Sequence, residues 1–128
     1  MTVPDSVLKP VEIAAQAAAD KLADNIVAFD VSEQLSITDV FLIASAGNER
    51  QVGAIVDGVE EALLKHKLKP TRREGDRENR WVLLDFIDLV VHVMHTEERA
   101  LYALERLWRD CPVIELPEDV LAANAENR

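Results

Sequence analysis

Residues 80–95, RWVLLDFIDLVVHVMH, constrain the fold of this chain more than any other stretch. Two runs rich in branched and aromatic side chains flank a short segment bounded by aspartates, which is the pattern of two strands joined by a turn. With Phe86 and Ile87 as a two-residue turn, the register of this hairpin is fixed. It sets Asp85 opposite Asp88, Leu83 opposite Val90 and Trp81 opposite His92.

Side chains alternate along a strand, so this hairpin has two unlike faces. One face is wholly apolar and is expected to be core: Val82, Leu84, Leu89, Val91 and Val93. A mixed aromatic, aliphatic and charged surface is typical of interfaces, although a second core face under a helix shows the same pattern. The mixed face holds Trp81, Leu83, Asp85, Asp88, Val90, His92 and Met94.

The two opposed carboxylates, Asp85 and Asp88, allow three interpretations. Aspartate forms turns well, it pairs with a lysine or arginine of a partner, and converging carboxylates hold a metal or act as an acid/base pair. Supporting catalytic residues are scarce. His92 and His95 point to opposite faces of a strand, Cys111 lies at a helix end with no evident base, and SAGNER matches no nucleotide fingerprint. We therefore expect no metal and no cofactor.

The remaining pattern predicts three helices and about five strands, forming an α/β (α+β) fold with a mixed central sheet. Helices are expected at about 10–23, from a cap at Asn48 to near Pro70, and from a cap at Thr96 to near Pro112. Gln51 would complete a capping box with Asn48. Strands are expected at 26–31, 40–45 and 71–74, besides the hairpin. Residues 1–112 would form a single domain, and 113–128 a partly disordered tail with few anchors.

Each predicted helix has one apolar stripe at helical spacing. The stripes are Val11, Ala14, Ala15, Ala18 and Leu22 in the first helix; Val52, Ile55, Val56, Val59 and Leu63 in the second; and Leu101, Leu104, Leu107 and Trp108 in the third.

The formal net charge of −10 argues against nucleic acid as the main ligand and suits a basic protein partner. Residues 65–80 differ, with seven basic against three acidic side chains, and form either a solvated loop or a local phosphate contact. We expect a reduced, cytosolic setting from the single cysteine, and neither a leader peptide nor a membrane span from the apolar pattern.

The chain resembles the Iojap-related ribosomal silencing factor (RsfS) family in five segments that keep their order. These are SITDVFLIASAGNERQVGAIVD, REG, RWVLLDFIDLVVHVMH, RALYALERLW and DCP. The resemblance as a whole covers roughly residues 14–112. One departure lies in the hairpin turn, where many members carry glycine and this chain has Ile87. Isoleucine tolerates a positive φ poorly, so the turn type and the register above stay open. Val40 and Ala46 also differ from the common residues.

The resemblance implies a fold similar to nucleotidyltransferases without their catalytic carboxylates, and no enzymatic activity. It implies a cytosolic protein that binds large-subunit ribosomal protein fourteen, blocks subunit association and represses translation when nutrients are limited. It also implies a homodimer of the free protein, and residues 65–80 could touch ribosomal RNA. Matching motif positions assign partner contacts to Trp81, Leu83, Asp85, Asp88 and His92, with Tyr102 and Trp108 as further candidates.

Two other functions stay open at this point. The first is a nucleotidyltransferase-like enzyme that uses Asp85 and Asp88 on Mg²⁺, and the second is a purely self-associating module.

Overall fold

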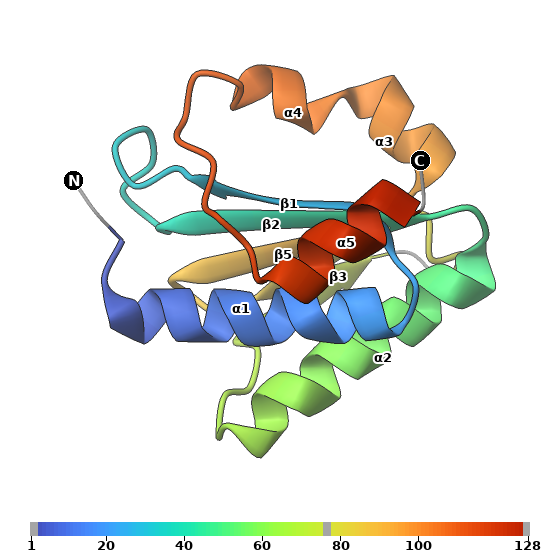
Figure 1. Ribbon diagram of the computed structural model, residues 1–128, viewed down its shortest axis with the longest axis horizontal. Helices are drawn as coiled ribbons and strands as arrows, with labels where there is room; N and C mark the ends of the chain where they lie inside the picture. Colours follow the sequence, from blue (N-terminus) through green and yellow to red (C-terminus); the bar gives the residue numbers. More distant parts are fainter. Residues whose placement is uncertain (1–2, 76–77, 127–128) are drawn as a thin grey trace.

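A five-stranded mixed sheet with helices on both faces forms the molecule, as a computed structural model of residues 3–75 and 78–126 describes it (Figure 1). The strand order is β1-β2-β5-β4-β3, and only the β2–β5 pair among these strands is parallel. The strands are β1 (Asp24–Asp30), β2 (Val40–Ala46), β3 (Arg72–Gly75), β4 (Trp81–Asp85) and β5 (Leu89–His95). The predicted fold class and strand number are confirmed.

The described chain forms five helices rather than the three expected from the sequence. They are α1 (Asp5–Asp20), α2 (Glu49–Lys65), α3 (Thr96–Tyr102), α4 (Leu104–Leu107) and α5 (Glu118–Glu126). In Figure 1, α1 and α2 lie on one side of the sheet and α3 and α4 on the other. None of the helices in residues 3–75 and 78–126 has the length and apolarity that a membrane crossing requires.

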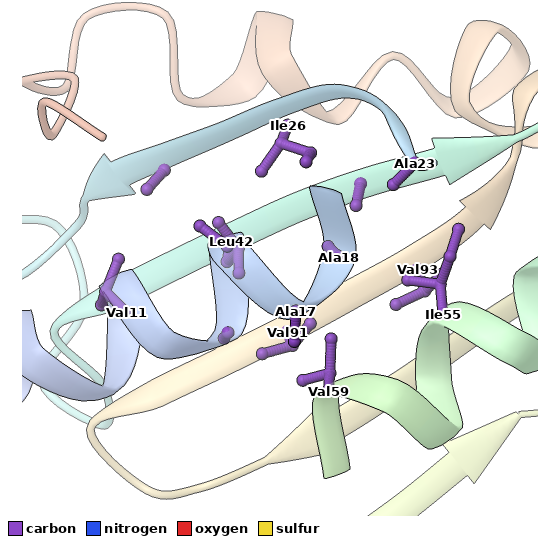
Figure 2. Close-up of a cluster of buried hydrophobic side chains, with 14 of the residues drawn as sticks. Val11, Ala17, Ala18, Ala23, Ile26, Leu42, Ile55, Val59, Val91 and Val93 are labelled. Atoms are coloured by element: carbon purple, nitrogen blue, oxygen red, sulfur yellow. The ribbon is translucent and has the colours of Figure 1, made fainter. Parts of the chain in front are cut away.

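The first face of the sheet, which packs against α1 and α2, holds the main core. Figure 2 shows side chains of both helices meeting aliphatic side chains of β1, β2 and β5. Alanines on α1 let this helix approach the sheet closely, and the predicted stripe of α2 is buried along its whole length. Removing these apolar surfaces from water supplies most of the stabilisation of the domain.

A local cap sets the start of α2, and burial of an apolar side chain sets the start of α1. Asn48 caps α2 as predicted, because its Oδ1 accepts a hydrogen bond of 2.8 Å from the Gln51 backbone N–H. The Gln51 side chain does not complete a capping box and instead donates to the Leu22 carbonyl at 3.1 Å. α1 begins five residues before the expected Pro10, because burial of Val7 extends its apolar face.

The predicted stripe of α1 is wrong at its last position, Leu22. The helix ends at Asp20, and Leu22 has a left-handed backbone with φ 63°. The chain reverses there toward β1, so the side chain points to solvent instead of continuing the helical face.

The expected third helix is broken into α3 and α4 at Ala103, whose φ is 48°. His95 rather than Thr96 caps α3, since the His95 Nδ1 accepts from the Glu97 backbone N–H at 3.1 Å. The break directs Leu104 toward the sheet and leaves Leu101 and Leu107 exposed. The prediction of a single apolar face along this segment is therefore wrong.

The β4–β5 hairpin has a longer turn than predicted. Trp81 pairs with Met94, Leu83 with His92 and Asp85 with Val90, so residues 86–88 form the connection. Asp88 does not face Asp85. The register differs by two residues from the predicted one, and this even shift keeps every strand side chain on its predicted face.

The segment after Pro112 is anchored, in contrast to the loose tail that we expected. Val113 forms an isolated bridge with Phe29, and the Ile114 N–H donates to the Ala28 carbonyl at 2.8 Å. In α5, Val120 is buried, and the Asn124 side-chain amide bonds both the N–H and the carbonyl of Ile26. These contacts cover the outer edge of β1. The sequence of the covering segment has little hydrophobic periodicity, so its structure was not predictable from the pattern.

Candidate protein-binding surface

The second face of the sheet is only partly covered. Phe29, Ile43 and Met94 lie in a smaller core cluster, against which Leu104 and Trp108 pack from the α4 side. The β4 side chains on this face, Trp81, Leu83 and Asp85, are only half-buried. We call the group formed by Trp81, Leu83, Asp85 and Tyr102 the open strip.

Trp81 is the largest side chain of the open strip, and its ring is held by two neighbours. Its indole Nε1 donates a hydrogen bond of 3.1 Å to Nδ1 of His92. The ring of Tyr102, from α3, lies against it with a centroid distance of 5.0 Å. A fixed aromatic ring loses little conformational entropy when a partner covers it, which suits it as an anchor.

His92 lies beneath the open strip rather than on it, being only 6% exposed. Burial lowers the pKa of His92 to about 4, so the imidazole is neutral near pH 7. Because Nδ1 accepts from Trp81, the ring proton resides on Nε2. This Nε2 is buried and has no hydrogen-bond partner among the described residues.

The aromatic cluster continues under α4. Phe41 contacts His92 edge-on at a centroid distance of 4.9 Å and Trp108 at 5.3 Å. Trp108 thus belongs to the smaller core, and its buried indole nitrogen also has no partner within residues 3–75 and 78–126. His92 is therefore buried, whereas Trp108 keeps part of its side chain exposed at the edge of α4.

Asp85 is engaged within the chain. Its Oδ1 accepts a hydrogen bond of 2.8 Å from the Ile87 backbone N–H, and its Oδ2 lies 3.5 Å from Nε of Arg72. The first contact is the turn-forming role that aspartate commonly fills. Asp88 is exposed in the turn, and its backbone carbonyl accepts from the N–H groups of Asp39 and Val40. The two carboxylates therefore do not form the opposed pair predicted from the sequence.

No group of three or more His, Cys, Asp or Glu side chains could hold a metal ion in the part of the chain that the structure describes. Cys111 is buried, and its burial, followed by the charges of Asp30, Asp110 and Glu33, raises the pKa of the thiol. A thiol held in its neutral form is a weak nucleophile.

The basic segment at 65–80 is largely neutralised by acids of the same chain. Arg80 donates to Glu49, Glu97 and Glu98, which ties the N-termini of α2 and α3 together. Arg73 pairs with Asp57 and Glu60 of α2, and Lys65 with Glu61. Lys67 and Lys69 are exposed and make no ion pair with the described residues, whereas Asp76 and Arg77 lie outside them.

Comparisons with known proteins identify the family. The family described as "Ribosomal silencing factor during starvation" matches residues 4–128. The chain belongs to the ribosomal silencing factor family. It is 41% identical to the ribosomal silencing factor RsfS of Halalkalibacterium halodurans, covering 82% of this chain and 90% of that one. It is 40% identical to the RsfS of Bacillus subtilis, covering 87% and 92%.

The fold is also similar to a crystal structure of a protein from Chromobacterium violaceum. The TM-score is 0.76 at 30% sequence identity, over 84% of this chain and 88% of that chain. The family match extends to residue 128 and so includes the segment after Pro112. The resemblance read from the sequence is therefore confirmed at the level of family and fold.

In this member of the family, the predicted contact residues separate into three groups. Trp81, Leu83, Asp85 and Tyr102 are brought together on the surface, Asp88 lies at the hairpin turn, and His92 lies underneath. Sequence reasoning missed the exposed Leu101 and Leu107, which it assigned to the core. No local signal marks them, since the helical period places them on the same stripe as Leu104.

Proposed function

We propose that this silencing factor binds large-subunit ribosomal protein fourteen through the open strip and thereby blocks association of the ribosomal subunits. Translation would be repressed by occupation of a surface, without chemistry, in the cytoplasm and under nutrient limitation. The observation that carries the proposal is a half-buried tryptophan, held by His92 and Tyr102, on a sheet face that the helices leave partly open.

The charge of the chain supports a basic protein as the partner. The net charge is −10, and the basic segment is mostly engaged in internal ion pairs. An acidic surface attracts a basic partner over a distance of about one Debye length, ~8 Å at physiological salt, and repels phosphate. Ribosomal proteins that contact RNA are basic, so the negative charge of this chain would attract them.

Each residue of the surface then has a separate role. Trp81 is the anchor, while Leu83 and Tyr102 enlarge the apolar area around it. Asp85 and Asp88 contribute negative charge at one end of the strip. His92 acts as a positioning residue that holds the indole by accepting its N–H, rather than as a contact itself.

Two further interactions belong to the same proposal. The free protein would form a homodimer that covers the open strip, so that dimerisation and ribosome binding exclude each other. Contact with ribosomal RNA would be minor and limited to the rim, because Lys67 and Lys69 alone among the described basic residues of 65–80 have no ion pair.

A magnesium-dependent nucleotidyltransferase is the less supported alternative. Its two metal-binding carboxylates would be Asp85 and Asp88, but Asp85 already caps the turn and contacts Arg72. Turnover of nucleotide by the native protein that is lost in an Asp85→Asn, Asp88→Asn double variant would favour that enzyme.

Co-sedimentation with purified large ribosomal subunits tests the proposal. The native protein, Trp81→Ala and the control Leu64→Ala are compared, with circular dichroism confirming that all three are folded. Leu64 is an exposed apolar residue on α2, on the opposite side of the molecule. The native protein and Leu64→Ala should pellet, whereas Trp81→Ala should bind at least about tenfold more weakly.

The same three proteins are then added to separated subunits before they are mixed. The native protein and Leu64→Ala should reduce the fraction of joined ribosomes, and Trp81→Ala should not. Binding of the native protein that leaves subunit joining unchanged would contradict the blocking mechanism. Equal binding by folded Trp81→Ala would retain the partner and reject the open strip.

A further inference from the structure

The hairpin turn holds a residue that its backbone conformation disfavours. Ile87 has φ 74°, in the left-handed region, and its side chain is 57% exposed. A branched Cβ clashes with the backbone there, and isoleucine is among the least suited residues for this region. Among the described non-glycine residues with positive φ, Ile87 is the only one that is branched at Cβ.

The strained backbone at Ile87 is not offset by any evident stabilising contact of its side chain. The turn itself is set by Asp85, which accepts the Ile87 N–H, and glycine would adopt the same conformation without strain. The exposed side chain adds little to the core. Backbone strain kept at an exposed position is a reason to look for a function of the side chain.

A second exposed isoleucine lies on the adjoining loop. Ile37, between β1 and β2, is 80% exposed. The two loops are joined because the Asp88 carbonyl accepts hydrogen bonds from the N–H groups of Asp39, at 3.1 Å, and Val40, at 3.0 Å. Figure 1 shows this loop and the start of β5 at the same end of the sheet.

Two carboxylates accompany these apolar side chains. Asp39 and Asp88 make no ion pair with any residue in 3–75 or 78–126. We call Ile37, Asp39, Ile87 and Asp88 the isoleucine tip. Its apolar side chains suit the alkyl stems of lysine and arginine, and its carboxylates suit their charged ends, whereas phosphate would be repelled.

We propose that the isoleucine tip is a second contact point for a basic protein surface, continuous with the open strip through Asp85. The proposal rests on the proposed function, because it takes the partner of the open strip as the occupant. Ile87 adds apolar contact area at the edge of that interface, and the left-handed turn presents it to the partner. The strain lowers the stability of the free protein and leaves the side chain available for binding.

The substitution Ile87→Gly separates this proposal from a structural role, because it should change stability and binding in opposite directions. The melting temperature should rise by about 4 °C through relief of strain. Binding to purified large ribosomal subunits should weaken by about tenfold. Ile87→Asn, which tolerates the left-handed conformation but is polar, should weaken binding similarly.

Leu22→Gly is the matched control. Leu22 also has a left-handed backbone, φ 63°, and is 68% exposed, but it lies in the turn between α1 and β1. Its substitution should raise the melting temperature and leave binding unchanged.

The outcomes distinguish the inference from the function on which it rests. Native protein that fails to bind large subunits would refute the proposed function, and this inference with it. Native binding that Ile87→Gly and Ile87→Asn both retain would refute the isoleucine tip alone. Binding lost in Ile87→Gly but kept in Ile87→Asn would assign the effect to turn flexibility and also refute the tip.

Discussion

The two faces of the sheet are built for different purposes. The first face is closed by α1 and α2 with small and medium aliphatic side chains, nearly all of them fully buried. The second face carries aromatic rings, a buried histidine and two buried N–H groups without partners in the described chain. Its cover leaves Trp81, Leu83 and Asp85 of β4 only half-buried. One face forms the main core, and the other carries the surface that we propose for recognition.

The difference shows how one strand can serve both purposes. Alternate residues of β4 point to opposite faces, so Leu84 lies in the main core and the adjacent Leu83 lies on the open strip. Substitutions at neighbouring positions should therefore separate stability from binding. The following experiments test this contrast.

The largest expected effect on stability comes from Leu84→Ala, with Leu83→Ala as its matched control. Leu84 is fully buried, so truncation should lower the free energy of unfolding by about 2–5 kcal/mol. Leu83→Ala should cost only about 1 kcal/mol, since its side chain is half-exposed, but it should weaken binding to large subunits. Urea unfolding of both variants measures the difference, and equal losses would remove the contrast between the faces.

An intermediate effect is expected from the titration of His92. Its pKa in the folded protein, about 4, lies below the ordinary value of 6.5, so the unfolded chain takes up the proton first as pH falls. This contribution to stability is complete above about pH 6.5 and declines as pH falls toward 4, by about 2 kcal/mol between pH 7 and pH 5.

The variant His92→Gln should remove that part of the pH dependence while keeping an acceptor for the Trp81 indole. Urea unfolding of the native protein and the variant at pH 7 and pH 5 isolates the histidine from the carboxylates, which both proteins share. An unchanged dependence on pH in the variant would show that His92 is hydrated, and that the second face is more open than described.

The smallest expected effect concerns the helix break over the second face. Ala103→Gly should raise the free energy of unfolding by about 1 kcal/mol, because glycine adopts the left-handed conformation freely. Ala100→Gly, at an exposed position inside α3, should lower it by a similar amount. Thermal unfolding compares the two, and a loss of stability in both would mean that α3 and α4 form one continuous helix.

Much of the fold follows from local sequence. The stripe and cap of α2 were predictable because Asn48 and the spacing of Val52, Ile55 and Val59 act within one helix. The faces of the hairpin were also predictable, since strand alternation survives an even shift in register. The register itself was not, because it depends on the turn that Asp85 and Ile87 form.

For the candidate site, the sequence predicted which side chains share the second face, but it did not predict how deeply each is buried. Trp81, Leu83 and Asp85 follow from alternation, and the family resemblance pointed to them. The position of His92 beneath Trp81 depends on α3 and α4, which cover the second face from a distant part of the sequence. The exposure of each side chain on this face depends on how α3 and α4 pack over it, so no local sequence pattern predicts it.

The sequence by itself determined the mixed sheet, the apolar first face and the acidic character of the chain, because periodicity and charge belong to residues rather than to contacts. The tertiary structure alone decided which charges are neutralised and which apolar residues stay exposed. Arg80 meets Glu49 and Glu98 only once α2 and α3 are placed, and Leu101 reaches solvent only because the helix breaks at Ala103. Such pairings join residues that are far apart along the chain, so their energies appear only when the elements pack.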